Sequence, residues 1–243
     1  MGLKIFIMGM DEPLFLPRLY DEVLKVRKGD VVGATLSPGF ISMKRIIGQY
    51  RVWGLPSFIK KSLYFLYYKL VGHSVESVIK KHGVMIYKAK DINGGEFLGT
   101  LRNLNVDLII SLNSPKKFSK ELLKIPKRGC INMHFGMLPR YRGIMPIFWA
   151  ILNGEEEIGI SIHYMDEKID NGDIIVQKAV KIEKEDNLDS LYKKSFRLAP
   201  SLILEAIDKI ESGNVRVIKN DEKRATYFSF PRKEDIEQYK KLR

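Results

Sequence analysis

The stretch from Asn132 to Gly143, NMHFGMLPRYRG, combines an amide, an imidazole, a proline and two arginines. It begins inside CINMH (130–134), which is predicted to be a buried strand. Side chains at i and i+2 of a strand point to the same face, so Asn132 and His134 are expected to lie together at the strand's end. An amide and an imidazole that converge there can stabilise a developing oxyanion. Because Asn-x-His alone has little specificity, a structural Asn and a surface His are the alternative interpretation.

An acidic connection, MDEKIDNGD (165–173), is the second candidate for chemistry. A carboxylate on this connection, placed beside His134, would favour the charged imidazolium. The Asp-Asn-Gly sequence is also typical of a tight turn, where the residues serve only the backbone. A composite metal site is a further alternative, although the histidines of the chain lack metal-ligand spacing. Its members would be His134, His163, Asp166 and Asp170.

Other motifs narrow the function classes. Arg140 and Arg142 keep their charge and could hold a phosphate or a carboxylate. No G-x-G-x-x-G follows the first predicted strand, which leaves a dinucleotide site unsupported. The sequence also lacks G-x-x-x-x-G-K-[ST] and G-x-S-x-G, the signatures of P-loop proteins and α/β-hydrolases.

Short apolar runs alternate with segments of helical periodicity along the first part of the chain. The predicted strands are 4–9, 30–38, 84–90, 107–113 and 130–134. The predicted helices are 13–26, 74–83, 95–105 and 146–154. This alternation predicts an α/β, Rossmann-like fold with a mostly parallel sheet and helices on both faces.

The later part of the chain follows a different pattern. Two strands close in sequence, 159–165 and 172–182, predict an antiparallel pair. A long helix is predicted over 187–213, with a kink at Pro200. We therefore expect a catalytic domain over 1–213 and a short C-terminal extension over 214–243.

The composition is that of a globular protein with a basic surface. Lys and Arg number 41 against 29 Asp and Glu, a net charge of +12, which favours an anionic partner. The single cysteine, Cys130, excludes a disulfide framework and a Cys-based zinc cage. The N-terminal residues resemble neither a signal peptide nor a membrane span, so a cytoplasmic protein is expected, and a homodimer is left open.

Segment 31–75 contains no acidic residue, and it includes the aromatic and basic run SFIKKSLYFLYYKL (57–70). This run could form an amphipathic helix that touches a membrane or an anionic ligand. The favoured interpretation is a helix packed on the sheet with a solvated Lys edge, because the aromatic residues are too continuous for two clean faces.

Two segments carry a resemblance to a known family. GCINMHFGMLPRYRGIMP (129–146) resembles the formyltransferase motif Asn-x-His-x-Ser-Leu-Leu-Pro-x-Tyr-Arg-Gly. YMDEKIDNGDII (164–175) resembles the partner segment that contains the family's catalytic Asp. The resemblance implies transfer of a formyl group from 10-formyltetrahydrofolate to a primary amine, without a metal. By matching positions it implies three catalytic residues, Asn132, His134 and Asp170. One departure is Gly136, where the family often has Ser.

The resemblance also implies a folate pocket between the loops 111–115 and 165–170. Apolar walls and backbone hydrogen-bonding groups would suit a flat pterin. The residues expected to line it are Leu112, Asn113, Met165, Asp166 and Ile169.

The subfamilies of formyltransferases differ in the amine that they formylate and in the segments that surround the shared motifs. The first strand leads into GMDEPLF rather than the Gly-Ser-Asn phosphate loop that is typical of glycinamide ribonucleotide formyltransferases. Methionyl-tRNA formyltransferases add a C-terminal β-barrel, for which too little chain is expected after residue 213. The ending TYFSFPRKEDIEQY resembles sugar N-formyltransferases of surface polysaccharide synthesis, so a nucleotide-linked amino sugar is the first expectation. A methionyl-tRNA formyltransferase-like enzyme and a non-catalytic folate- or RNA-binding module are the alternatives.

Overall fold

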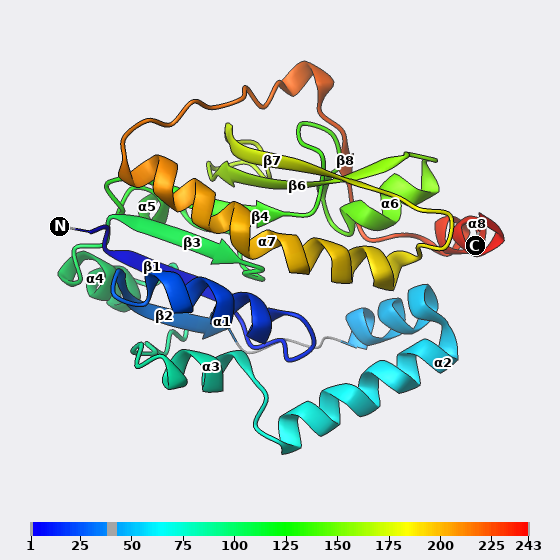
Figure 1. Ribbon diagram of the computed structural model, residues 1–243, viewed down its shortest axis with the longest axis horizontal. Helices are drawn as coiled ribbons and strands as arrows, with labels where there is room; N and C mark the ends of the chain where they lie inside the picture. Colours follow the sequence, from blue (N-terminus) through cyan, green and yellow to red (C-terminus); the bar gives the residue numbers. More distant parts are fainter. Residues whose placement is uncertain (1, 38–42, 243) are drawn as a thin grey trace.

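The computed structural model describes residues 2–37 and 43–242, and its centre is a six-stranded sheet (Figure 1). The strands are β1 (Ile5–Met10), β2 (Val31–Ser37), β3 (Leu108–Leu112), β4 (Cys130–His134), β6 (Glu157–Tyr164) and β7 (Ile174–Lys181). Their order is β2-β1-β3-β4-β6-β7, with parallel pairing from β2 to β4 and antiparallel pairing of β6 with both β4 and β7. The α/β fold and the late antiparallel pair are therefore confirmed.

Helices cover both faces of this sheet, as expected for parallel strands such as β1 and β3, which are almost entirely apolar. One face packs on α1 (Leu16–Arg27), α3 (Val75–Lys81), α6 (Pro146–Leu152) and α7 (Leu188–Glu211). The other face packs on α4 (Gly95–Asn103) and α5 (Lys120–Leu123). The chain ends with the short 3₁₀ turn η1 (Glu222–Arg224) and helix α8 (Lys233–Leu242). A small parallel pair joins β5 (Arg142–Gly143) to β8 (Tyr227–Phe228).

The helix signals in the sequence act as expected. Ser74 caps α3 in a capping box with Ser77, and Gly83 follows the helix with a positive φ of 73°. Asn187 caps α7 in the same way, with Ser190 as its partner. Pro200 lies buried within α7, which continues through it as one helix.

The strand predicted over 84–90 is wrong in extent. Only Ile86 pairs with the sheet, through a single bridge to Ala34 on β2. The side chain of Tyr87 lies over Gly33, 5.9 Å from the ring of Phe6, and is partly buried against the core on that face of the sheet. Residue 38, the last of the strand predicted over 30–38, lies outside the described residues.

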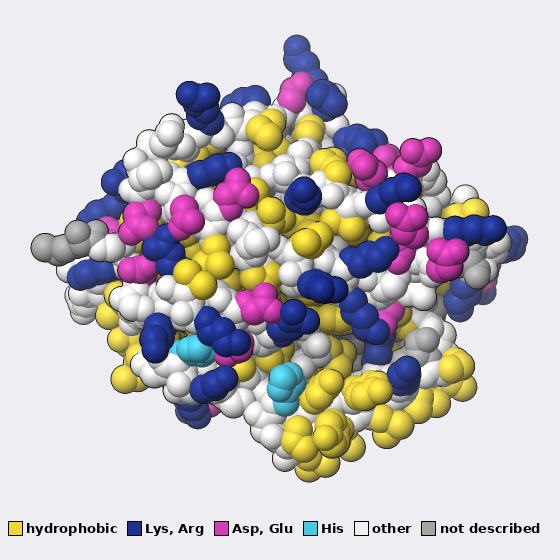
Figure 2. Space-filling model, viewed as in Figure 1, with side chains coloured by type: hydrophobic (Ala, Val, Ile, Leu, Met, Phe, Trp, Pro, Cys, Tyr) yellow, Lys and Arg dark blue, Asp and Glu magenta, His cyan; other side chains and the backbone are white. Residues whose placement is uncertain are grey.

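The interpretation of segment 57–70 as a helix packed on the sheet is also wrong. The segment belongs to α2 (Met43–Leu70), which is interrupted at Gly54 and extends away from the sheet (Figure 1). Apolar side chains occur all around this helix, so a large part of them stays exposed after one side has packed. Figure 2 shows hydrophobic side chains gathered in this region. Within the part of the chain that is described, no helix is both long and apolar enough to cross a membrane.

Candidate active site

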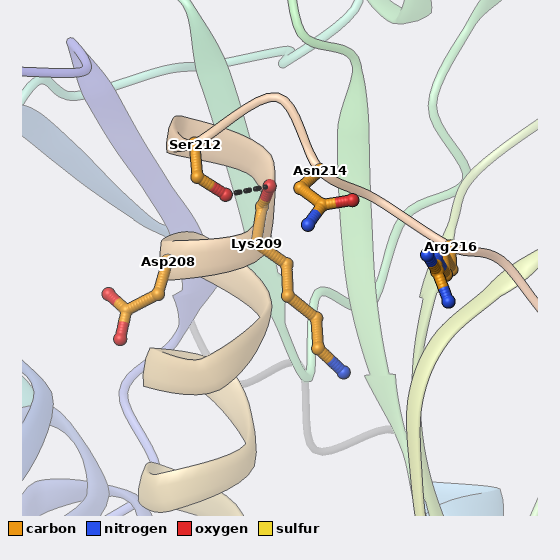
Figure 3. Close-up of a pocket in the computed structure, with 5 residues that line it drawn as sticks. All are labelled: Asp208, Lys209, Ser212, Asn214 and Arg216. Carbon is orange, nitrogen blue, oxygen red and sulfur yellow. Dashed lines mark hydrogen bonds between the residues drawn. The ribbon is translucent and has the colours of Figure 1, made fainter.

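An open pocket of about 560 Å³ lies beside the C-terminal end of α7 (Figure 3). It is lined by Asp208, Lys209, Ser212, Asn214 and Arg216. The end of α7 pairs with Arg27, the last residue of α1, which also pairs with Asp30 directly before β2. This pocket therefore lies at the amino edge of the parallel strands. None of the site residues predicted from the sequence lines it. The candidate site is instead at the carboxyl edge, where open α/β sheets bind ligands.

Polar side chains form a row across β4, β6 and β7 at that edge. Asn132 is paired in register with His163, and His134 with Ser161, which is in turn paired with Gln177. Ser161 Oγ donates to the Gly136 carbonyl at 2.6 Å, and Gln177 Nε2 donates to the Leu138 carbonyl at 3.0 Å. The row therefore holds the start of the loop that follows His134.

The three predicted catalytic residues come together, with His163 between two of them. Nδ1 of His134 lies 3.4 Å from Oδ2 of Asp170, and Nε2 of His163 lies 3.6 Å from Oδ1 of the same carboxylate. Nδ2 of Asn132 lies 3.2 Å from Nε2 of His163. His163, which the sequence indicated only as a metal-ligand alternative, thus links Asn132 to Asp170. The antiparallel register of β4 and β6 is the signal that identifies it.

Asp170 is held in place by the backbone around it. Its φ is 49°, in the left-handed region that is unfavourable for a side chain with a Cβ. Its Oδ2 accepts a hydrogen bond from the N–H of Gly143 at 2.8 Å. Gly143 has a φ of 97°, and a Cβ there would collide with the Phe228 carbonyl oxygen of the neighbouring strand β8. Glycine is therefore required at the position that presents this donor.

The pKa shifts of His134 and Asp170 agree only in part with the expectation that the carboxylate makes His134 cationic. Burial lowers the pKa of His134 below its ordinary value, while the Asp170 carboxylate and the Tyr141 carbonyl oppose this shift. For Asp170, burial alone would raise the pKa, but His134, His163 and the Gly143 N–H outweigh it and lower the pKa well below its ordinary value. The free site thus combines an ionised carboxylate with a His134 ring that resists protonation.

The ring of His134 is fixed from both sides. Nε2 lies 2.7 Å from the carbonyl oxygen of Tyr141, which can only accept, so this nitrogen carries a proton and donates. A Cβ added at Gly136 would lie 2.5 Å from Nε2 and 2.8 Å from the same carbonyl. Gly136, where the related motif often has Ser, therefore leaves the space that the ring occupies.

The expectation that two arginines bind an anion is not supported by their contacts. Arg142 is buried, and its Nη1 donates to Asn171 at 2.8 Å and to Glu222 at 3.0 Å. Arg140 pairs with Glu155, at 2.6 Å from Nη1 to Oε1. Both guanidinium groups are therefore engaged with carboxylates of the chain itself.

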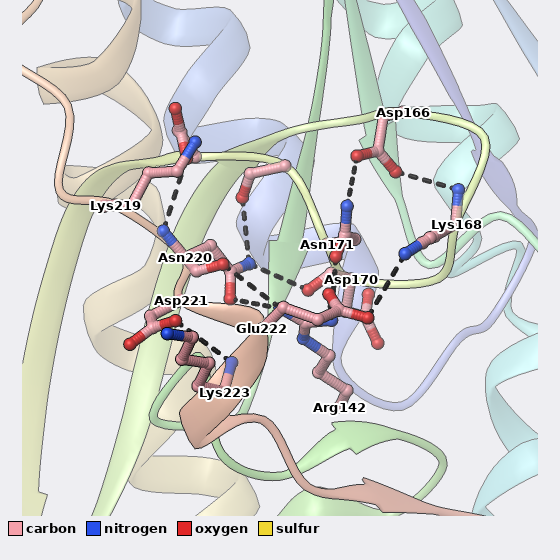
Figure 4. A network of polar contacts seen from close by, with 12 residues as sticks. Arg142, Asp166, Lys168, Asp170, Asn171, Lys219, Asn220, Asp221, Glu222 and Lys223 are labelled. Carbon is pink, nitrogen blue, oxygen red and sulfur yellow. Dashed lines mark hydrogen bonds and ion pairs between the residues drawn. The ribbon is translucent and has the colours of Figure 1, made fainter.

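Asn220, which no pattern in the sequence indicated, connects Arg142 to the loop that carries Asp170 (Figure 4). Its Oδ1 accepts from Nη2 of Arg142 at 2.8 Å. Its Nδ2 donates to the carbonyl oxygens of Asp170 and Gly172, each at 2.9 Å. Asn220 is only 4% exposed and belongs to the segment expected to be an extension. Segment 214–243 therefore supports the site, while the domain division at residue 213 stays a prediction.

The predicted folate-lining residues occupy different environments. Leu112 is fully buried in the core, so only its backbone can face a ligand. Met165 is partly buried against the core beneath the sheet. Asp166 accepts hydrogen bonds from Asn171 and from the N–H of Lys168, which shape the turn. Asn113, with a φ of 61°, and Ile169, 47% exposed, remain on loops at the carboxyl edge.

No group of three or more His, Cys, Asp or Glu side chains with an arrangement suited to a metal ion is found among the described residues. Asp166, one of the four residues in the metal alternative, makes its contacts with Asn171 and Lys168 within its own loop. The absence of a metal requirement stays a prediction.

The chain is similar in sequence to known proteins over much of its length. Residues 60–207 match the family described as formyl transferase. A methionyl-tRNA formyltransferase of Kosmotoga olearia is 36% identical over 167 residues, 69% of this chain and 54% of that protein. The chain thus spans about half the length of the curated relatives it matches.

Solved structures share the fold. Phosphoribosylglycinamide formyltransferase from Bacillus halodurans superposes with a TM-score of 0.63 at 20% identity, covering 85% of this chain and 95% of that one. An N-formyltransferase from Helicobacter canadensis, solved with folinic acid and dTDP-3-aminofucose, has a TM-score of 0.62 at 20% identity, covering 93% and 71%. With the family match over residues 60–207, these findings establish that the chain belongs to the formyl transferase family.

Proposed function

We propose that this protein transfers a formyl group from 10-formyltetrahydrofolate to the primary amine of a nucleotide-linked amino sugar. The observation that carries the formyl transfer is the convergence of Asn132, His134 and Asp170 at the carboxyl edge of the sheet, with 3.4 Å between His134 and Asp170. A protein that only bound folate or RNA would not need an amide, an imidazole and a carboxylate at this spacing.

In the proposed reaction the neutral amine nitrogen attacks the formyl carbon, and a tetrahedral oxyanion forms. The Asn132 amide and the N–H at Nε2 of His134 are the donors for this oxyanion, which would compete with the Tyr141 carbonyl for the His134 proton. The growing negative charge favours the protonated imidazole that burial disfavours in the free site. Asp170 accepts the proton that the attacking nitrogen loses, directly or through a water. As the oxyanion collapses to the new formamide, this proton passes to N10 of the folate and the bond from carbon to N10 breaks.

The folate is proposed to bind between the loops 111–115 and 165–170. Asn113 and Ile169 supply exposed polar and apolar groups there, Met165 supplies a partly buried wall, and the backbone near Leu112 and Asp166 supplies hydrogen-bonding groups. The folinic acid in the Helicobacter canadensis N-formyltransferase supports a folate as the formyl donor.

The acceptor proposal is supported by the loop between β1 and α1. A helix N-terminus with free N–H groups is a ready phosphate site, but here Glu12 occupies it. Its carboxylate accepts from the N–H groups of Leu14 at 2.8 Å, Phe15 at 2.9 Å and Leu16 at 3.3 Å. A ribonucleotide phosphate at this position is therefore disfavoured. The sugar nucleotide bound by the Helicobacter canadensis enzyme favours a sugar nucleotide here, and the net charge of +12 is compatible with such an anion.

Methionyl-tRNA is the second candidate acceptor. The observation that favours it is the 36% identity to a methionyl-tRNA formyltransferase over 167 residues. The basic character of the chain suits either anion, so charge does not separate the two candidates.

The test measures tetrahydrofolate release from 10-formyltetrahydrofolate with a dTDP-linked amino sugar and with methionyl-tRNA, across a salt series. The sugar nucleotide should give the higher kcat/KM and a shallow salt dependence, since it presents only a diphosphate. Binding of tRNA would weaken by roughly 0.7–0.9 log units per log unit of salt for each phosphate contact. His134→Ala serves as the background control. Higher efficiency on methionyl-tRNA with a steep salt slope would reverse the ranking, and no release with either acceptor would remove the proposal.

A further inference from the structure

The second half of α2 carries an exposed apolar stripe. Five side chains recur at intervals of three or four residues, which places them on one side of a helix. They are Leu55 (54% exposed), Ile59 (48%), Leu63 (62%), Leu66 (56%) and Leu70 (79%). We call these five residues the α2 stripe. The neighbouring rings of Tyr64 and Tyr67 are also exposed, at 46% and 57%.

The opposite side of the same helix fixes its orientation. Lys61 forms an ion pair with Asp189 at the start of α7, and its Nζ lies 4.1 Å from the centre of the Trp53 ring. The ring of Tyr68 packs against His73, with 4.8 Å between ring centres and a tilt of 44° between the ring planes. Because these contacts hold the inner side, the α2 stripe faces away from the rest of the chain.

The charged residues of segment 31–75, which contains the stripe, are all basic. Segment 31–75 contains no Asp or Glu, and the exposed Lys60 lies directly beside Ile59 in the sequence. An apolar stripe flanked by cationic groups and tyrosines is suited to the boundary between headgroups and acyl chains of an anionic membrane. A second copy of the chain would bring like charges together, since each copy carries a net charge of +12 and segment 31–75 offers no carboxylate to pair with Lys60.

We propose that α2 binds the surface of an anionic phospholipid membrane, lying in the plane of the interface with the α2 stripe inserted. Leu63 and Leu66 lie at the middle of the stripe and enter the acyl boundary, while Lys60 contacts lipid phosphates. The helix follows β2 and pairs with the start of α7, so the membrane lies on the side of the carboxyl edge of the sheet.

The test is co-sedimentation of the full chain with vesicles of phosphatidylcholine, with and without phosphatidylglycerol. We expect binding to the anionic vesicles that is at least about tenfold stronger than to neutral ones at low salt and that weakens as salt rises. Lys60→Glu should reduce the preference for phosphatidylglycerol. Equal binding to both vesicle types, or binding to neither, overturns the proposal.

The apolar contribution is tested with the double variant Leu63→Asp, Leu66→Asp. It should bind anionic vesicles roughly a hundredfold more weakly, because burial of each leucine contributes on the order of tenfold. The matched control is Val26→Asp, Met85→Asp, two apolar residues that are each 63% exposed outside α2, and it should bind as the parent does. Retained binding by the α2 variant overturns the proposal. So does a dimer in sedimentation equilibrium that the α2 variant alone abolishes, since the stripe would then be covered by a second copy.

Discussion

Replacing Asn220 by Ala removes a side chain that supports the loop carrying Asp170 without being expected to touch a substrate. Its amide makes two hydrogen bonds to the carbonyl oxygens of Asp170 and Gly172 and one to the guanidinium of Arg142. Asn220 is 4% exposed, so these groups would lose their partner in a buried setting. The left-handed conformation of Asp170, with its φ of 49°, would lose one of the contacts that hold it.

The loss can be estimated bond by bond. A neutral hydrogen bond contributes about 1 kcal/mol and one to a charged group about 1.5–3 kcal/mol, so Asn220→Ala should cost roughly 3–5 kcal/mol. For a chain of this length each kcal/mol lowers Tm by about 2–4 °C. We therefore expect a Tm lowered by roughly 6–20 °C in thermal unfolding followed by circular dichroism. The control is Asn214→Ala on the same segment, where the side chain is exposed and the change should stay within about 0.5 kcal/mol.

The role in positioning is separated from stability by kinetics well below the Tm of the variant. Asn220→Ala should lower kcat more than it raises KM, because the Asp170 carboxylate would be displaced while the substrate loops remain. Asn220→Asp keeps an oxygen for Arg142 but sets a second oxygen against the two carbonyls, so it should not restore kcat. Restored turnover in Asn220→Asp would refute this reasoning and make the Arg142 contact the important one.

Four further predictions concern the site and the loop before α1. His134→Ala and Asn132→Ala should each lower kcat by about 10²–10³, as expected for an oxyanion donor, and near-normal turnover in either would remove its assigned role. Because the pKa of Asp170 is lower in the folded state, its carboxylate stabilises the fold fully above the unfolded pKa of about 3.9. The difference in Tm between the parent and Asp170→Asn should therefore shrink as the pH falls below that value, and a constant difference would contradict this. Activity should survive treatment with a chelator, whereas loss of activity that zinc restores would revive the metal alternative. Glu12→Ala frees three N–H groups, so inorganic phosphate should raise the Tm of this variant and leave the parent unchanged.

Local patterns in the sequence were sufficient for most of the sheet, whereas the proposed trio of Asn132, His134 and Asp170 followed from the resemblance to the formyltransferase motifs. Apolar runs and capping residues act within a few residues, so β1, β4 and the start of α3 at Ser74 followed from short-range rules. The side chains of Asn132 and His134 were expected on the same face of β4 because side chains alternate along a strand with a period of two residues. The strand predicted over 84–90 was wrong in extent, because only Ile86 meets the edge strand β2 and a local pattern does not show how far a run stays beside a neighbouring strand.

Only the tertiary structure decided which distant groups support the site and which stay exposed. His163 reaches the trio through the register of β4 and β6, and Asn220 reaches Asp170 across 50 residues of chain, so no local pattern identifies either contact. Burial lowers the pKa of His134, whereas the carboxylate that the sequence placed beside it would by itself raise that pKa. The exposure of the α2 stripe likewise depends on where the rest of the chain packs. Sequence determines the chemistry that each side chain carries, while its partners and its solvation depend on long-range packing.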